Sequence, residues 1–231
     1  GFYQSAAVGL QSAAGAMWAK QDQKQIRQLF SKAEFSLHTI TVFLFSCSGI
    51  LIVPFIQVYT AGLTDANYIQ PLFAVTLVVA YGIRCLRTPY NIWILAAGHF
   101  KQTQKCHIAA AVLNLTSSIL AVSRWGLVGV AVGTLIAMCY QTIWMMLYTT
   151  KNLIPCTWSQ VRKRWLADIA AVALICGVTA GMELGTISYF GWFCLAGKVA
   201  AIALACLALV SWIFYPREIR YLMGLLAGRI M

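Results

Sequence analysis

Continuous apolar runs of about twenty residues constrain this fold more than any other feature of the sequence. They lie at roughly 38–59, 71–98, 107–122, 126–148, 166–184 and 192–215. A helix rises about 1.5 Å per residue, so about 20 residues span a hydrocarbon core of about 30 Å. Membrane β-barrels show instead a weak alternation over segments of about ten residues. The sequence therefore predicts an all-α integral membrane protein with six complete transmembrane helices.

Composition excludes an ordinary water-soluble domain, because 61% of the residues are hydrophobic and only 10% are charged. A typical soluble domain is about 45–50% apolar and about 25% charged. The first 18 residues, GFYQSAAVGLQSAAGAMW, have the composition of a membrane helix already under way, with no basic leader before it. We therefore expect one partial crossing at 1–18, and we expect the chain to be the C-terminal part of a longer protein.

The basic residues predict the orientation in the membrane. Thirteen of the 17 Lys and Arg residues lie in alternate connections, at 19–37, 99–106, 150–165 and in the tail at Arg217, Arg220 and Arg229. The intervening connections hold one, Arg124. The positive-inside rule then places 19–37 and the C-terminus in the cytoplasm. The net charge of +11 is thereby explained by topology and anionic lipid headgroups, and we expect no nucleic-acid partner.

Two glycine pairs have the spacing that lets membrane helices approach closely. Gly129 and Gly133 form one GxxxG motif, and Gly177 and Gly181 form another. Glycine at this spacing permits close backbone contact, although glycine is also common in membrane helices in general. The motifs predict helices that meet, and they carry no information about a transported molecule.

Two arginines lie inside an apolar run. Arg84 is about 21 Å of helix from Gln70, and Arg87 is about 15 Å from Ala97, on the helical rise. A charge at the centre of a membrane helix costs about 2.5–3.5 kcal/mol on insertion scales. The two residues share one helix face, so we expect that face to line an aqueous cavity. The forked donors of arginine match phosphate oxygens, which makes both residues candidate contacts for a diphosphate.

Two alternatives to this interpretation remain open at the level of sequence. The arginines pair with groups in a missing part of the protein, or the membrane boundary lies nearer Tyr90 and Arg87 reaches it. Pro89 predicts a kink beside these residues, and Tyr90 and Asn91 add polar groups there. Further polar side chains inside membrane runs, which either bond a neighbouring helix or face the cavity, are those of Asn114 and Gln141.

The sequence offers no recognisable catalytic or metal-binding motif. All six acidic residues fall in predicted loops or near helix ends: Asp22, Glu34, Asp65, Asp168, Glu183 and Glu218. The three histidines lie at predicted cytoplasmic boundaries: His38, His99 and His107. The eight cysteines contain no CxxC pair and are interpreted as small hydrophobic residues. We therefore expect no catalytic residue, no metal and no cofactor.

The chain resembles the bacterial polysaccharide and O-antigen flippases, the Wzx-type branch of the multidrug/oligosaccharidyl-lipid/polysaccharide exporter superfamily, in three stretches. These are SAAGAMWAKQDQKQIRQLFSKAEF (12–35), AYGIRCLRTPYNIWILAAGHFKQTQ (80–104) and GLVGVAVGTLIAMCYQTIWMMLYTTKNLI (126–154). The resemblance implies that 1–155 is the second bundle of a 12–14-helix transporter. It also implies that 156–231 is an extra helix pair with a cytoplasmic tail.

The resemblance implies a multi-pass flippase of the bacterial cytoplasmic membrane rather than an enzyme. Such a flippase moves undecaprenyl-diphosphate-linked oligosaccharide between leaflets, with Arg84 and Arg87 as the implied diphosphate contacts. Its partners would be the lipid-linked oligosaccharide, membrane lipid and a missing N-terminal helical bundle. The alternatives are a multidrug or cation antiporter of the same superfamily and a membrane-embedded glycan-modifying enzyme. The antiporter would need an acidic residue at mid-membrane, and the enzyme would need a catalytic group such as His99 or Asp65.

Overall fold

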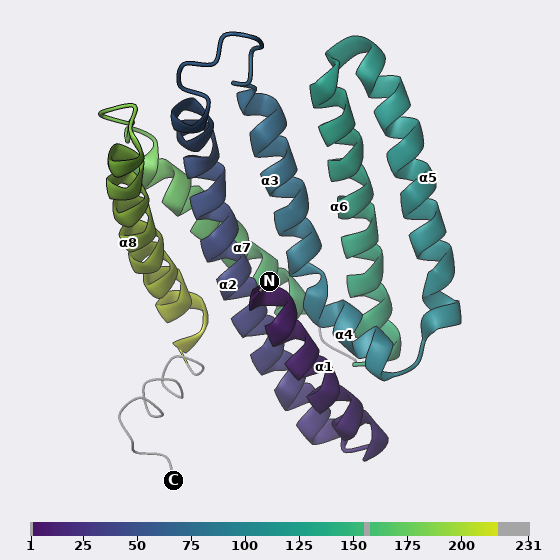
Figure 1. Cartoon of the computed structure of the whole chain (residues 1–231). Helices are drawn as coiled ribbons and strands as arrows, with labels where there is room; N and C mark the ends of the chain where they lie inside the picture. The colour runs from purple at the N-terminus through teal and green to yellow at the C-terminus, as the bar shows by residue number, and fades with distance from the viewer. Residues whose placement is uncertain (1, 155–157, 217–231) are drawn as a thin grey trace. The chain divides into compact units, whose positions relative to one another are not determined.

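The computed structural model describes residues 2–154 and 158–216, and its regular secondary structure there is entirely helical (Figure 1). The helices are α1 (Phe2–Ala19), α2 (Gln23–Tyr59), α3 (Pro71–Leu86), α4 (Thr88–Ala96), α5 (Phe100–Trp125), α6 (Leu127–Asn152), α7 (Trp158–Thr179) and α8 (Tyr189–Phe214). The predicted all-α class is confirmed. The basic tail residues Arg217, Arg220 and Arg229 lie outside the described residues.

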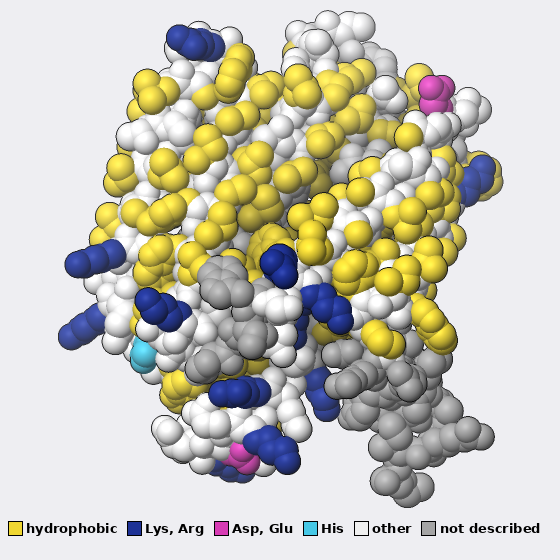
Figure 2. Space-filling view, turned by 180° about the vertical axis from the view of Figure 1, so that it is seen from behind, with side chains coloured by type: hydrophobic (Ala, Val, Ile, Leu, Met, Phe, Trp, Pro, Cys, Tyr) yellow, Lys and Arg dark blue, Asp and Glu magenta, His cyan; other side chains and the backbone are white. Residues whose placement is uncertain are grey.

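Five helical stretches in the described residues are long and apolar enough to cross a membrane. They are Gln23–Tyr59, Pro71–Ala96, Phe100–Trp125, Leu127–Asn152 and Tyr189–Phe214. Apolar side chains cover much of the face shown in Figure 2, and Leu120 and Phe190 are 74% and 79% exposed. An apolar surface this extensive requires lipid rather than water around it. The chain is a multi-pass membrane protein.

The sixth expected crossing, at 166–184, is where the structure differs from the prediction. Helix α7 ends at Thr179, and every 18-residue stretch within its 22 residues contains Arg162, Lys163, Arg164 and Asp168. The helix has too many charges and too short an apolar part to be counted with the other five. Helix α1 occupies the predicted partial crossing at 1–18 and is also not among them.

The expected cytoplasmic loop at 19–37 is mostly helix. The chain turns at 20–22, and α2 begins at Gln23 because the Asp22 carboxylate caps it. Asp22 Oδ1 accepts hydrogen bonds from the backbone N–H groups of Lys24 and Gln25 at 3.0 and 3.1 Å. With 37 residues, α2 is about 55 Å long, so its basic first turns extend beyond a hydrocarbon core of about 30 Å.

The chain divides into two compact units, and the first comprises 1–41 and 70–156. Within it, α6 packs against α3 on one side and α5 on the other, and α4 contacts α1 and α6 (Figure 1). Gly126, with φ of +53°, makes the sharp turn that joins α5 to α6. The first GxxxG motif lies in this contact: a Cβ on Gly129 would be 2.6 Å from Val122 N, and one on Gly133 2.7 Å from Ser118 N.

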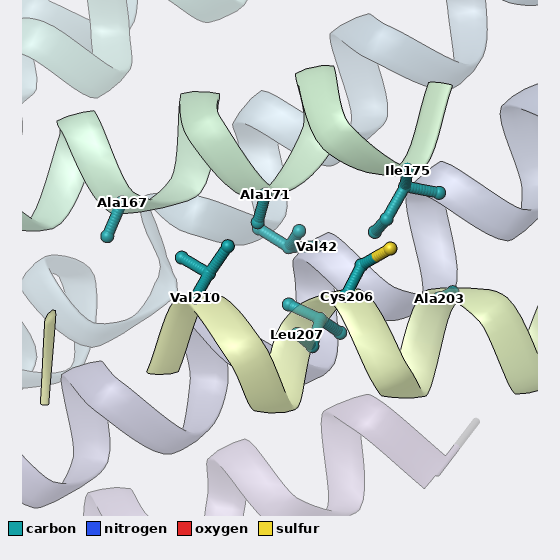
Figure 3. Close-up of a cluster of buried hydrophobic side chains, with 8 residues drawn as sticks. All are labelled: Val42, Ala167, Ala171, Ile175, Ala203, Cys206, Leu207 and Val210. Atoms are coloured by element: carbon teal, nitrogen blue, oxygen red, sulfur yellow. The ribbon is translucent and has the colours of Figure 1, made fainter. Parts of the chain in front are cut away.

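The second unit comprises 42–69 and 157–231, and its described core is aliphatic. Helices α7 and α8 pack on the second half of α2 around one cluster, drawn in Figure 3, of Val42, Ala167, Ala171, Ile175, Ala203, Cys206, Leu207 and Val210. The second GxxxG motif takes no part. Gly181 lies beyond the end of α7, and a Cβ on either Gly177 or Gly181 would have no neighbour within 4 Å. Only the first of the two predicted glycine contacts is therefore present in the described residues.

Candidate functional site

The helix that carries both arginines is interrupted at Arg87. Helix α3 ends at Leu86 and α4 begins at Thr88, with Pro89 as the second residue of α4. Proline lacks a backbone N–H, and its ring conflicts with the carbonyl four residues earlier, so it tends to kink or break a helix. The break falls where the sequence predicts a kink, and it leaves Arg87 at the junction between the two helices.

Arg87 is the first member of a chain of polar side chains that connects three helical segments. Arg87 Nη1 donates a hydrogen bond to Oε1 of Gln141, which lies on α6 and is 7% exposed. Gln141 Nε2 lies 2.7 Å from Nδ1 of His107 on α5. We call these three residues the polar chain. It joins the α3–α4 junction, α6 and α5 inside the first unit.

All three residues of the polar chain lie in helical stretches that are long and apolar enough to cross a membrane. Arg87 is about 24 Å along the helix from Pro71, and Gln141 is about 21 Å from Leu127. His107 is about 27 Å from Trp125, at the far end of α5. All three residues therefore lie nearer the ends of these stretches that are predicted to face the cytoplasm.

Arg84 lies one turn before Arg87 but does not join the polar chain. Its side chain is exposed, and its guanidinium carbon lies 5.9 Å from the centre of the Tyr81 ring. Among the described residues, the side-chain partner of Arg87 is a neutral amide and that of Arg84 is an aromatic ring, and neither partner is a carboxylate. Gln141 takes one of the five N–H donors of Arg87, and the remaining donors have the geometry that suits phosphate oxygens.

Tyr90 belongs to a second polar contact, one turn further along α4. It is fully buried, and its hydroxyl donates to Glu34 Oε1 at 2.6 Å. Its carbonyl accepts a hydrogen bond from Thr149 Oγ1 of α6 at 3.3 Å. Phe30 and His38 pack against its ring, with ring centres 5.9 and 6.3 Å away. Tyr90 therefore connects α4 to both α2 and α6 at this end of the first unit.

Glu34 differs from the prediction. The sequence predicts it in a loop, whereas it lies inside α2 and is 2% exposed. The signal that identifies its helix is the apolar spacing of four buried residues through the basic segment, Ile26, Phe30, Ala33 and Leu37. The many charged residues of this segment make a loop the simpler prediction and obscure the helical spacing of its apolar residues.

The other predicted residues lie outside the polar chain. Asn91 is half-buried and lines a surface depression of about 350 Å³ between α4 and α5, together with Lys101, Gln104 and His107. Asn114 bonds within its own helix, because its Oδ1 accepts a hydrogen bond from Ser118 Oγ at 3.2 Å. His107, which the sequence predicts at a cytoplasmic boundary, lies inside α5 and contacts Gln141.

Comparison with known proteins identifies no family. Protein-family models, curated proteins and solved structures all give no match. Within the described residues, no group of three or more His, Cys, Asp or Glu side chains is arranged to hold a metal ion. The fold therefore defines the class, a helical multi-pass membrane protein. Its first unit contains an arginine, Arg87, that lies in the candidate span Pro71–Ala96 and donates a hydrogen bond to the neutral amide of Gln141.

Proposed function

We propose that this chain is part of a flippase that translocates undecaprenyl-diphosphate-linked oligosaccharide across the bacterial cytoplasmic membrane for polysaccharide or O-antigen biosynthesis. It would form the second bundle of that transporter, beside an N-terminal helical bundle, with its C-terminus in the cytoplasm. The proposal is supported by the multi-pass helical fold and by the sequence resemblance of 12–35, 80–104 and 126–154 to such flippases.

One observation carries the proposal, and it is the position of Arg87. A guanidinium about 14 Å from the nearer end of the candidate span Pro71–Ala96, bonded to a neutral amide, keeps its positive charge where charge is expensive. A bound diphosphate would neutralise that charge and use the donors that Gln141 leaves available. Arg84, one turn away and exposed, would supply a second cation on the path of the same group.

The physical logic of transport follows from these charges. A glycan and its diphosphate cannot cross hydrocarbon without polar partners, because an unpaired buried charge is prohibitively costly. A cationic, hydrated path would carry the polar part of the substrate, and the polyprenyl tail would stay in the bilayer. Binding must also be weak enough for release on the other side, which favours a few exchangeable hydrogen bonds over a closed ion-pair cage.

The test uses the intact gene in its host. We expect Arg87→Ala to reduce surface polysaccharide at least tenfold and to accumulate lipid-linked oligosaccharide on the cytoplasmic leaflet. That effect corresponds to a loss of about 1.4 kcal/mol or more of binding, the size of one charge-assisted hydrogen bond. Arg84→Ala should show the same defect to a smaller degree. The matched control is Arg124→Ala, which removes an exposed arginine in the last turn of α5 and should leave transport unchanged.

Other outcomes separate the alternatives. Normal surface glycan with altered drug sensitivity in the deletion strain would favour an antiporter. Glycan that is flipped but chemically incomplete would favour a glycan-modifying enzyme. Wild-type transport in both arginine variants, with normal protein levels in the membrane, would refute the assignment of Arg84 and Arg87.

A further inference from the structure

The orientation of the Gln141 amide follows from the chemistry of its two partners. Arginine has only donors, so Gln141 must present its oxygen to Arg87. The amide nitrogen then points to His107, and an amide NH₂ group only donates. His107 Nδ1 must therefore accept, which requires a lone pair on that atom. In this arrangement His107 is neutral, with its proton on Nε2.

A second proton on His107 is incompatible with that arrangement. Protonated imidazole carries N–H groups on both nitrogens, so Nδ1 would become a donor facing the donor on Gln141. The amide relieves this conflict by turning its oxygen toward His107. Its NH₂ group then faces Arg87, which has no acceptor to offer. One proton on His107 therefore breaks the bond between Gln141 and Arg87.

Protons can reach His107 from the end of the unit predicted to be cytoplasmic. The side chain is exposed and lines the depression between α4 and α5. The charged or titratable groups around it are Arg87 at the α3–α4 junction and Lys101 on α5, and the polar groups are Asn91 on α4 and Gln141 on α6. A cationic His107 beside Arg87 is unfavourable unless an anion is present, so proton and anion stabilise one another's binding.

We propose that His107 is a proton-binding site coupled, through the amide of Gln141, to anion binding at Arg87. This rests on the proposed function, because it takes Arg87 as the residue that receives the diphosphate. The step is an exchange of hydrogen bonds in which His107 gains one proton from solvent, Gln141 transfers its oxygen from Arg87 to His107, and Arg87 turns its donors to the anion. The anion is therefore bound together with a proton.

Binding of inorganic pyrophosphate to the full-length protein in lipid nanodiscs tests the coupling. Typical coupling between two sites changes affinity by about 5- to 150-fold. Pyrophosphate itself gains a proton between pH 7.5 and 5.5, so the informative quantity is the ratio of Kd values at these two pH values, compared between variants. We expect the Kd at pH 7.5 divided by the Kd at pH 5.5 to be at least about five times larger for the wild type than for His107→Asn. Gln104→Leu, which alters the same depression outside the polar chain, is the matched control and should behave as wild type.

A measurement without ligand makes the two proposals separable. In protein labelled with ¹⁵N-arginine, the Arg87 side-chain signal should shift between pH 7.5 and 5.5 in the wild type and in Gln104→Leu. The signal should not shift in His107→Asn, which has no imidazole to protonate. It should also not shift in Gln141→Leu, which has no amide to connect His107 with Arg87.

Pyrophosphate binding that depends on Arg87 but has the same pH ratio in wild type and His107→Asn would overturn the coupling and leave the proposed function standing. If pyrophosphate shows no Arg87-dependent binding at either pH, the proposed function fails, and the Arg87 signal alone decides the coupling. A pH shift that is lost in both variants supports it, and a wild-type signal that does not move overturns it.

Discussion

The α5–α6 hairpin and the α7–α8 pair are built from helices of similar length but pack by different means. In the first, glycines let the backbones touch, and polar side chains lie between the helices, with Ser117 Oγ 3.5 Å from the carbonyl of Gly133. Gln141 and His107 continue this polar contact toward the α3–α4 junction. In the second, the contact is a cluster of Ala, Ile, Val, Leu and Cys side chains (Figure 3).

This difference concerns the polar side chains of the first unit, which close packing of helices does not by itself require. Lipid tails are as apolar as aliphatic side chains, so helix association in a bilayer depends on close fit and on hydrogen bonds. An aliphatic contact such as that of α7 and α8 is sufficient to hold two helices together. A buried amide beside an arginine adds desolvation costs that packing alone does not require. The proposed binding role of the polar chain would account for that cost.

Replacement of the glycines in the α5–α6 hairpin should have the greatest effect on stability. In the first hairpin, a methyl group at Gly129 or Gly133 would overlap backbone atoms of α5, so the helices must separate. Overpacking costs about 1–3 kcal/mol per site, and we expect the Gly129→Ala/Gly133→Ala double variant to lose about 2–6 kcal/mol of unfolding free energy. Reversible denaturation in mixed micelles measures this loss.

The second glycine pair supplies the matched control. Gly177→Ala/Gly181→Ala adds the same two methyl groups in open space, and Gly177 lies inside α7. Alanine favours a helix over glycine by up to about 1 kcal/mol, so this variant should be neutral or slightly more stable. Equal losses of unfolding free energy in the two double variants would contradict the distinction between the α5–α6 hairpin and the α7–α8 pair.

A second test addresses the buried hydroxyl of the first unit. Tyr90→Phe removes the donor to the Glu34 carboxylate and leaves the aromatic packing in place. Hydrogen bonds to charged groups contribute about 1.5–3 kcal/mol, and we expect a loss of that size. Tyr81→Phe, at a ring that is 49% exposed, is the control and should be close to neutral in the same denaturation assay. An unchanged midpoint for Tyr90→Phe would show that this contact adds no stability.

Sequence reasoning located the spans because their signal is local. A run such as 126–148 needs only its own residues to be identified, and α6 covers it. The interruption near Arg87 also has a local signal, because Pro89 favours a break there, although α2 continues through Pro54. Charge density is a poor guide in both directions. The basic segment before Glu34 is helix, and the charges at the start of α7 leave that helix outside the five candidate spans.

The partners of the predicted site residues were beyond the reach of the sequence. Arg87 and Gln141 are separated by 54 positions, and Gln141 and His107 by 34. Nothing in the local pattern distinguishes Gln141, which joins the polar chain, from Asn114, which bonds within its own helix. The choice depends on which face of α5 and of α6 meets the junction, and that is set by the close glycine contact between the two helices.

The smallest expected effect concerns the second unit, where a hydrogen bond does reach between helices. Trp192 Nε1 on α8 donates to the carbonyl of Leu51 on α2 at 3.3 Å, and its ring packs on Phe55. Because the aliphatic cluster holds this unit, Trp192→Phe should cost only about 0.5–1.5 kcal/mol, the net value of one neutral hydrogen bond. Trp212→Phe, at a ring that is 61% exposed, controls for loss of indole area. A loss as large as that of Tyr90→Phe would mean that the second unit also depends on its polar contacts, and the contrast between the units would then lie in their glycines alone.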